Sequence, residues 1–142
     1  MRNKTETGLG NKVETRQILA ILYPHLDYRN GDFHKDHIFA ESFFTRKRLK
    51  ELGIKEEQFD FYLNPENYNS ILNLQLLDGN ENKSKQDADL GEWVKKESKS
   101  KGLTQKEFCE RHLLPEIFDI TEFQTFIKTR RDNLKGILKQ LA

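Results

Sequence analysis

Residues 71–85 read ILNLQLLDGNENKSK, and this stretch decides the fold that we expect of the chain. Its first seven residues are mostly apolar, which predicts a short buried strand over 71–77. Asp78 is a good helix N-cap, and Glu81 follows three residues later at the spacing of a capping box. The stretch therefore predicts a strand, a tight turn and a helix that begins near Gly79.

A second stretch, residues 33–39 (FHKDHIF), carries the side chains with the most chemistry. Asp36 and His37 are adjacent, so in an extended strand they point to opposite faces and can serve one site only if the strand ends or bends there. If this stretch pairs with 71–77, the first turn of the following helix lies over both strands. Asp36 and Asn82 can then give oxygen ligands to one hard cation. A neutral His37 imidazole beside it suits a general base.

Composition excludes several classes of protein. The 142 residues suit one domain, and 24 Lys+Arg against 23 Asp+Glu leave a net charge of +1, so any nucleic acid must be bound by local patches. Cys109 is the one cysteine, which rules out an internal disulfide and a multi-cysteine zinc site. A reduced, cytoplasmic location is expected. No apolar stretch approaches the roughly 20 residues that span a bilayer, so we expect no membrane contact.

The rest of the chain is expected to be largely helical. Residues 1–12 are polar and predict a flexible N-terminal arm, followed by a helix over 15–23. Two further capping boxes are expected, at Thr104 with Glu107 and at Thr121 with Gln124. The remaining expected elements are a turn at 27–32, helices at 41–52 and 56–63, a polar loop at 64–70 and a long C-terminal helix with one apolar face.

The combination of Asp-His-Ile at 36–38 with a strand, a turn and a helix carrying Asn-x-x-Lys at 82–85 resembles the ββα-metal motif of HNH endonucleases. It is most similar to the HNH-bearing C-terminal domain of GmrSD-type, modification-dependent restriction proteins, over roughly residues 13–141. The resemblance implies an α+β fold with a small ββα-metal core surrounded by several helices. It also implies that 13–142 is a single nuclease domain, the C-terminal part of a larger protein with an N-terminal ParB-like, nucleotide-dependent domain or subunit as its partner.

The resemblance assigns a role to each residue of the motif. His37 matches the general base that deprotonates the attacking water, and Asp36 and Asn82 match the ligands of a divalent metal, Mg²⁺ or another such as Mn²⁺. Asn73 matches the residue that holds the loop and orients the base. The implied activity is metal-dependent hydrolysis of DNA phosphodiester bonds, in restriction of phage or other foreign DNA.

Candidate DNA contacts surround the motif. Lys83 and Lys85 lie where relatives contact phosphate. Arg46 and Arg48 belong to a basic run on an expected helix. This run either contacts phosphate or forms a solvated face of the helix. His34 is either a phosphate contact or a turn residue.

Two departures from the family leave alternatives open. Relatives usually have Pro where this chain has Ala40, and the sequence contains nothing like the ParB-like domain. A catalytically silent nucleic-acid-binding or partner-docking module of the same fold is therefore the second hypothesis. The third is a purely helical interaction domain in which Asp36 and His37 are incidental.

Overall fold

The computed structural model describes residues 12–24, 26, 33–86 and 88–141. In this part of the chain eight α-helices and one two-stranded sheet confirm the expected α+β class. The α-helices are α1 (Lys12–Leu22), α2 (Arg46–Glu51), α3 (Phe59–Leu63), α4 (Pro65–Tyr68), α5 (Gly79–Lys85), α6 (Leu90–Ser100), α7 (Gln105–His112) and α8 (Phe123–Leu141). The strands are β2 (Phe33–His37) and β3 (Leu74–Asp78), and the 3₁₀ turns are η1 (Glu41–Phe43), η2 (Glu56–Gln58), η3 (Ile71–Asn73) and η4 (Ile120–Glu122).

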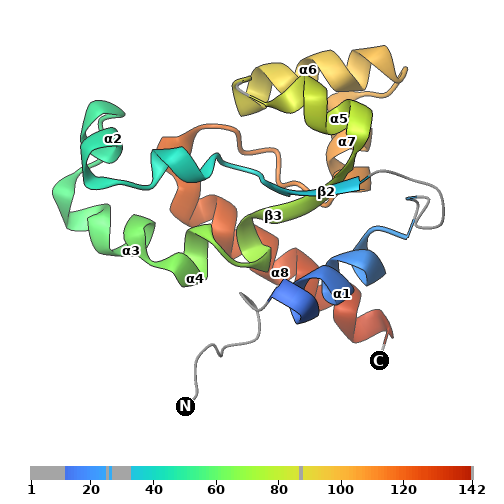
Figure 1. Ribbon diagram of the computed structural model, residues 1–142, viewed down its shortest axis with the longest axis horizontal. Coiled ribbons are helices and arrows are strands. Elements are labelled where there is room, and N and C mark those ends of the chain that lie inside the picture. Colours follow the sequence, from blue (N-terminus) through green and yellow to red (C-terminus); the bar gives the residue numbers. More distant parts are fainter. Residues whose placement is uncertain (1–11, 25, 27–32, 87, 142) are drawn as a thin grey trace.

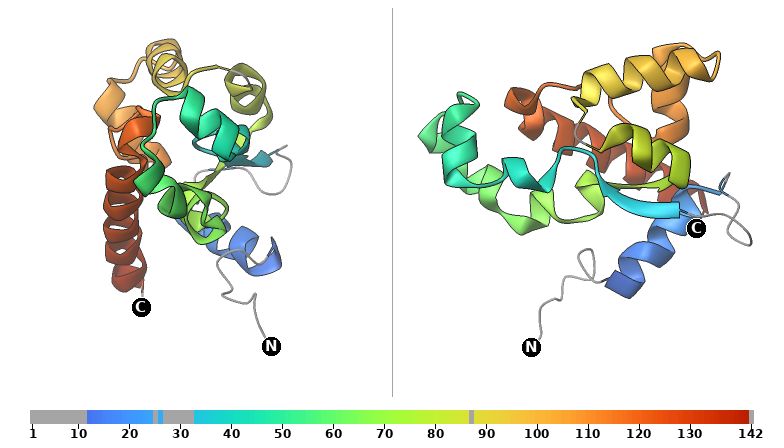
Figure 2. Two further views of the ribbon diagram at one scale, coloured as in Figure 1. Left: turned by 90° about the vertical axis from the view of Figure 1, so that its left-hand side faces the viewer. Right: turned by 45° about the horizontal axis from the view of Figure 1, so that its top comes forward.

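The sheet lies at the centre of the molecule and pairs two distant stretches of chain. β2 runs antiparallel to β3, with Asp36 opposite Gln75 and His37 opposite Leu74. Helices α5, α6 and α7 lie on one side of the sheet, and α1 and α8 lie on the other (Figures 1 and 2). The group α2–α4 lies beyond the end of the sheet at which β2 finishes (Figure 1). The third hypothesis, a purely helical domain, is therefore wrong.

Local sequence explains how β3 passes directly into α5. The Asp78 carboxylate accepts a hydrogen bond from Glu81 N (2.8 Å), and the Glu81 carboxylate accepts one from Asp78 N (3.2 Å). These two bonds complete the expected capping box and satisfy amides that the first turn of a helix leaves free. The strand therefore ends and the helix begins within one residue, which brings α5 back over the sheet.

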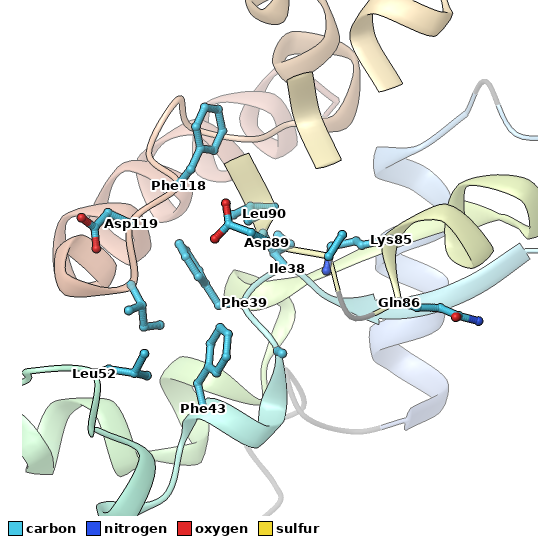
Figure 3. Close-up of a pocket in the computed structure, with 13 residues that line it drawn as sticks. Ile38, Phe39, Phe43, Leu52, Lys85, Gln86, Asp89, Leu90, Phe118 and Asp119 are labelled. Carbon is cyan, nitrogen blue, oxygen red and sulfur yellow. The ribbon is translucent and has the colours of Figure 1, made fainter. Parts of the chain in front are cut away.

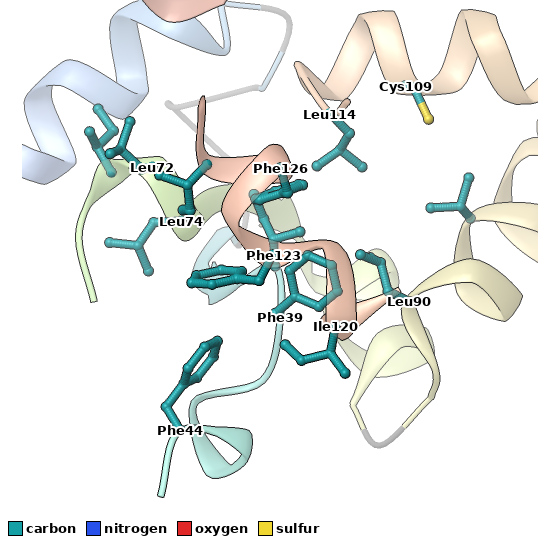
Figure 4. Packing of buried hydrophobic residues seen from close by; sticks show 14 of the residues in the cluster. Phe39, Phe44, Leu72, Leu74, Leu90, Cys109, Leu114, Ile120, Phe123 and Phe126 are labelled. Carbon is teal, nitrogen blue, oxygen red and sulfur yellow. The ribbon is translucent and has the colours of Figure 1, made fainter. Parts of the chain in front are cut away.

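A cluster of aromatic rings joins the sheet to α8. Phe39, just after β2, packs edge-on against Phe123 and Phe126, with ring centroids 5.7 and 4.9 Å apart. Phe44 and Tyr62 contact Phe123 from the α2–α4 side. Figure 4 shows these apolar side chains converging from α8, β3 and the segment after β2. The core therefore fixes the chain immediately beyond His37, the residue expected to be the base.

Arg130 is buried in this core, although it stands among the basic residues of the last helix. It has no exposed surface, and its guanidinium donates to the carbonyls of Leu113 (2.6 Å), Ile71 and Leu74 and to the Tyr23 hydroxyl. Leu113 is in the left-handed region (φ 57°), and the bond to its carbonyl holds that unusual end of α7 in place. The α8 helix is therefore anchored by charge as well as by apolar packing.

Three sequence predictions about element boundaries are wrong. The strand expected over 71–77 begins only at Leu74, because η3 occupies the three preceding residues. The helix expected over 41–52 is divided, since Thr45 caps a new helix with its side chain. The expected loop at 64–70 contains α4, which Asn64 caps.

The expected cap at Thr121 is also wrong. Asp119 caps η4 instead, and its carboxylate accepts hydrogen bonds from the Thr121 amide and hydroxyl. The box at Thr104 with Glu107 is confirmed. Of the expected arm at 1–12, only Lys12 is described, and it opens α1. The rest of the arm and the expected turn at 27–32 lie outside the described residues.

Candidate functional site

Asp36 lies on the face of the sheet that α5 covers. Its carboxylate oxygen Oδ2 accepts a hydrogen bond from Gln75 Nε2 (3.1 Å) on the paired strand. The same oxygen forms an ion pair with Lys85 Nζ at 3.1 Å. The Asp36 side chain keeps 17% of its surface exposed, so it is reachable from solvent. The carboxylate is thus held from two sides and still accessible.

Lys85 is buried, although its predicted role is contact with a DNA phosphate. The residue is 4% exposed, and its ammonium donates to the His37 carbonyl (3.0 Å) in addition to Asp36. The Trp93 ring lies 5.9 Å from Nζ, within the range of a cation–π contact. In this arrangement Lys85 can contact a phosphate only by leaving Asp36.

The oxygens of Asp36 and Gln75, and that of Asn82 on the helix above, are of the type that suits a hard divalent ion. Gln75 is fully buried, and among the described residues its oxygen Oε1 has no hydrogen-bond partner, which is a costly arrangement unless a cation or its water fills the position. Asn82 is half-buried on α5, one turn before Lys85, and α5 packs against both strands. Carboxylate and carboxamide oxygens are the ligands that Mg²⁺ and Mn²⁺ accept.

The site differs from metal centres that are built from several His, Cys, Asp or Glu side chains. Among residues 12–24, 26, 33–86 and 88–141, no group of three or more His, Cys, Asp or Glu side chains is placed to hold a metal ion. Any ion at Asp36 would therefore depend on amide, carbonyl or water oxygens for the rest of its ligands. Burial raises the pKa of the Cys109 thiol to about 12, so this thiol is protonated near neutral pH.

His37 is the last residue of β2 and points to the opposite face from Asp36, as alternation along a strand requires. Its Nε2 lies 2.9 Å from Asn69 Oδ1, at the end of α4. A carbonyl-type oxygen accepts, so with Asn69 in this orientation Nε2 carries the proton and Nδ1 is left to accept one. Asn69 therefore sets the tautomer of the candidate base.

Asn73 holds the segment that follows His37. Its side-chain oxygen accepts from Phe39 N (2.9 Å), and its Nδ2 donates to the carbonyls of Phe39 (3.0 Å) and Tyr68 (2.9 Å). The Asn73 carbonyl also accepts from Ile38 N (2.8 Å). Because Asn73 is fully buried, these bonds are shielded from water. One amide thus joins the chain after β2 to the loop that carries Asn69.

A buried charge network lies under the first turn of α5. The Glu81 carboxylate contacts His112 Nε2 at 2.8 Å and is paired with Lys101. Burial alone would raise the pKa of Glu81, but the hydrogen bond and charge of His112 and the hydrogen bonds from Lys101 and the Asp78 amide outweigh it and lower that pKa to about 2. His112, the last residue of α7, is only 1% exposed. The network ties α5 to α7 and so fixes the helix that carries Asn82.

The remaining predicted DNA contacts are spread over different parts of the molecule. Lys83 is exposed on α5. His34 is half-buried on β2 and shares the face of Asp36. Arg46 and Arg48 lie on α2, at the far end of the molecule from α5 (Figure 1). Arg48 pairs with Glu51 (3.1 Å), and the Arg46 guanidinium lies over the Phe59 ring. The structure brings Lys83 and His34 to the elements of the site and leaves the two arginines apart from it.

A pocket of about 480 Å³ opens beside the site. Its walls come from the segment after β2, from the end of α5 and from the segments that precede α6 and α8. Figure 3 shows Phe39 and Phe43 pointing into it, with Asp89 and Lys85 at its edge. The pocket is thus lined by apolar and polar groups alike, with Lys85 and Asp89 among the charged ones.

Two residues of the site were missed by sequence reasoning. Gln75 reads as an interruption in an apolar run, and the register against Asp36 is what gives it a role. Asn69 lies in a stretch with several Asn residues, and nothing in its spacing singles it out.

No protein-family model matches the chain, and no curated protein matches it. None of the helices in the described residues is long and apolar enough to cross a bilayer.

Proposed function

We propose that the chain is a divalent-metal-dependent endonuclease of the HNH type that hydrolyses DNA phosphodiester bonds. The observation that carries the proposal is the placement of Asp36. It lies on the face of the two-stranded sheet that α5 covers, next to the unpartnered oxygen of Gln75, and His37 ends the same strand. This order of strand, strand and helix, with an acid and an imidazole at one strand end, matches the resemblance found in the sequence.

Asp36 and Asn82 would hold the metal, with Gln75 Oε1 as a further oxygen for the ion or its water. When bound, a divalent ion supplies charge stabilisation at the scissile phosphate and at the leaving 3′ oxygen. Asp36 keeps its carboxylate in place through Gln75 Nε2. The capping box and the buried Glu81 fix the position of Asn82 on α5.

His37 would act as the general base. Its Nδ1 accepts a proton from the attacking water, while Asn69 holds the proton on Nε2. Asn69 is thus a positioning residue. The neutral imidazole is the form that can accept this proton.

The absence of the family proline does not loosen the loop after His37. Ala40 has φ −52°, close to the value that a proline ring imposes. Asn73 also binds both backbone groups of Phe39. Ala40 therefore adopts a proline-like conformation that the surrounding bonds maintain.

The test is nicking of supercoiled plasmid with Mg²⁺ or Mn²⁺, with and without chelator. His37→Ala is expected to lower the cleavage rate by roughly 10²-fold or more. Lys35→Ala is the matched control, because Lys35 is exposed on the same strand. Cleavage by His37→Ala at the wild-type rate, with both variants folded by circular dichroism, contradicts the assigned base. Wild-type cleavage that survives chelator contradicts the metal.

A second function, a catalytically silent nucleic-acid-binding or partner-docking module, is favoured by one observation. Lys85 already neutralises Asp36, the proposed metal ligand. A silent module binds DNA with an affinity that falls with salt. It does not cut DNA, whichever divalent metal is supplied. DNA binding without nicking, across Mg²⁺ and Mn²⁺, would support this second function. DNA, and a ParB-like domain or subunit, stay proposed partners.

A further inference from the structure

The Lys85 ammonium lies where a cation of the site would lie. Its Nζ is 3.1 Å from Asp36 Oδ2 and 3.0 Å from the His37 carbonyl oxygen. The Lys85 side chain is 5% exposed, so solvent contributes little to holding the charge there. A buried positive group between a carboxylate oxygen and a backbone carbonyl is in the surroundings that a hard metal ion selects.

Charge makes the two cations competitors. Asp36 and Lys85 cancel each other as they stand. A divalent ion at the same carboxylate would lie next to the ammonium, and their repulsion is strong at such short range in a partly buried site. Once the ammonium leaves, Asp36 Oδ2 and the His37 carbonyl are open to a metal ion. The unpartnered Gln75 Oε1 is a third oxygen available to the ion or its water.

The displaced ammonium has somewhere to go. Lys85 lines the pocket of about 480 Å³, and the Asp89 carboxylate lines it as well. Figure 3 shows both residues at its edge. The lysine side chain is flexible along its four-carbon stem, so Nζ can turn into this space without movement of the backbone. In the pocket it is solvated and free to meet an anion.

We infer that Lys85 is the internal counter-ion of the metal-free site, and that a divalent ion binds at Asp36 by exchange with the Lys85 ammonium. The inference rests on the proposed function, because it takes Asp36 as a metal ligand. It explains how a buried lysine can also be a phosphate contact: metal binding releases its ammonium beside the site. It further implies that the metal is bound more weakly than its oxygen ligands alone would allow.

The first test labels amines of the wild-type chain with an acetylating reagent, with and without Mn²⁺, and reads each lysine by mass spectrometry. Lys83 is the internal control, since it is exposed two residues away on the same helix. Lys85 labelling is expected to rise several-fold as Mn²⁺ saturates the site, while Lys83 labelling stays constant. In the Asp36→Asn variant, Lys85 should be labelled even without Mn²⁺, and adding Mn²⁺ should not change that labelling. Protection of Lys85 at saturating Mn²⁺ overturns the exchange.

The second test measures Mn²⁺ affinity by electron paramagnetic resonance of the free ion. Lys85→Met keeps an apolar stem against Trp93, and loss of the competing charge is expected to tighten Mn²⁺ binding at least about tenfold. Lys83→Met, which removes an exposed charge, should change the affinity by less than about twofold. A merely structural role for Lys85 predicts weaker binding, so unchanged or weaker binding by folded Lys85→Met overturns the inference.

The two proposals fail in different ways. Wild-type protein that binds Mn²⁺ through Asp36 and nicks DNA, yet keeps Lys85 protected, contradicts the exchange and leaves the nuclease proposal standing. Wild-type protein that binds no Mn²⁺ contradicts both. If Lys85→Met does not fold, the labelling of the wild-type chain decides alone.

Discussion

Removal of the Asn73 amide should cost the protein a large part of its stability. Asn73→Ala leaves three backbone groups without partners: the buried amide and carbonyl of Phe39 and the part-buried carbonyl of Tyr68. At about 1 kcal/mol for each group as a lower bound, the loss is ~3 kcal/mol, and the cavity left by the side chain adds to it. A domain of this kind has a total of roughly 5–15 kcal/mol. For a chain of this length the midpoint of thermal unfolding should fall by about 10 °C.

The assay is urea unfolding, followed by far-ultraviolet circular dichroism and by the fluorescence of Trp93, which is buried beside α5. Asn133→Ala on α8 is the matched control, because Asn133 is exposed and its truncation should change stability by less than about 0.5 kcal/mol. A difference of less than about 1 kcal/mol between the two variants would refute the reasoning, since the stranded groups would then carry no cost.

Asn73→Asp separates the hydrogen bonds from the packing. The new side chain has nearly the same shape and can still accept from Phe39 N, but a charged oxygen then faces the carbonyls of Phe39 and Tyr68. Burial and these carbonyls disfavour the ionised form, so the folded-state pKa of the aspartate should lie above its unfolded value. The variant should therefore lose stability, relative to wild type, as the pH rises from about 4 to 7. An equal loss at both pH values would contradict this account.

Three further predictions follow from buried or constrained groups. The pKa of Glu81 is lowered to about 2, so its pairing stabilises the fold above the ordinary pKa of 4.5, and that stability is lost as the pH falls toward 2. The loss of unfolding free energy over this range is ~3 kcal/mol. Urea unfolding across the same pH range should show this loss in wild type and not in Glu81→Gln. Arg130→Met should destabilise the fold by about 2 kcal/mol, because it leaves the buried Leu74 carbonyl and the part-buried Leu113 carbonyl without their donor, whereas Arg131→Met at the exposed neighbouring position should not. Ala40→Pro should raise stability by about 0.5 kcal/mol in thermal unfolding, because the native φ of −52° already suits proline, and a loss of stability would show that the segment is not so constrained.

The centre of the fold could be predicted from the sequence because its signals are local. The apolar run before Asp78 and the capping box with Glu81 act within a few residues, and α5 begins at Gly79 as these signals predict, directly after β3. The adjacency of Asp36 and His37 also predicts their divergence, which the pairing of β2 with β3 produces. These features need no knowledge of distant parts of the chain.

The features that were missed depend on contacts between distant segments. Arg130 looks like a surface residue on an amphipathic helix, and its burial becomes affordable only where carbonyls from residues 71, 74 and 113 converge on it. The burial of Lys85 likewise depends on a distant partner. Asp36 is 49 positions away by residue number, and the strand register brings it to Lys85. Charge patterns along the chain cannot show such pairs, because the acceptors belong to other elements.

The geometry of β2 bears directly on the proposed chemistry. Asp36 and His37 leave the strand on opposite faces, so the cation position and the candidate base lie on two sides of one strand end. On the proposed function, a phosphodiester bound across that end would meet the cation with one oxygen and the base through its attacking water. The Asn73 amide fixes the chain just beyond this end, joining it to the loop that orients the imidazole. On the proposed function, the two halves of the site would therefore be aligned by a residue that touches neither substrate nor metal. Loss of Asn73 should then lower the cleavage rate even at temperatures where the variant is fully folded.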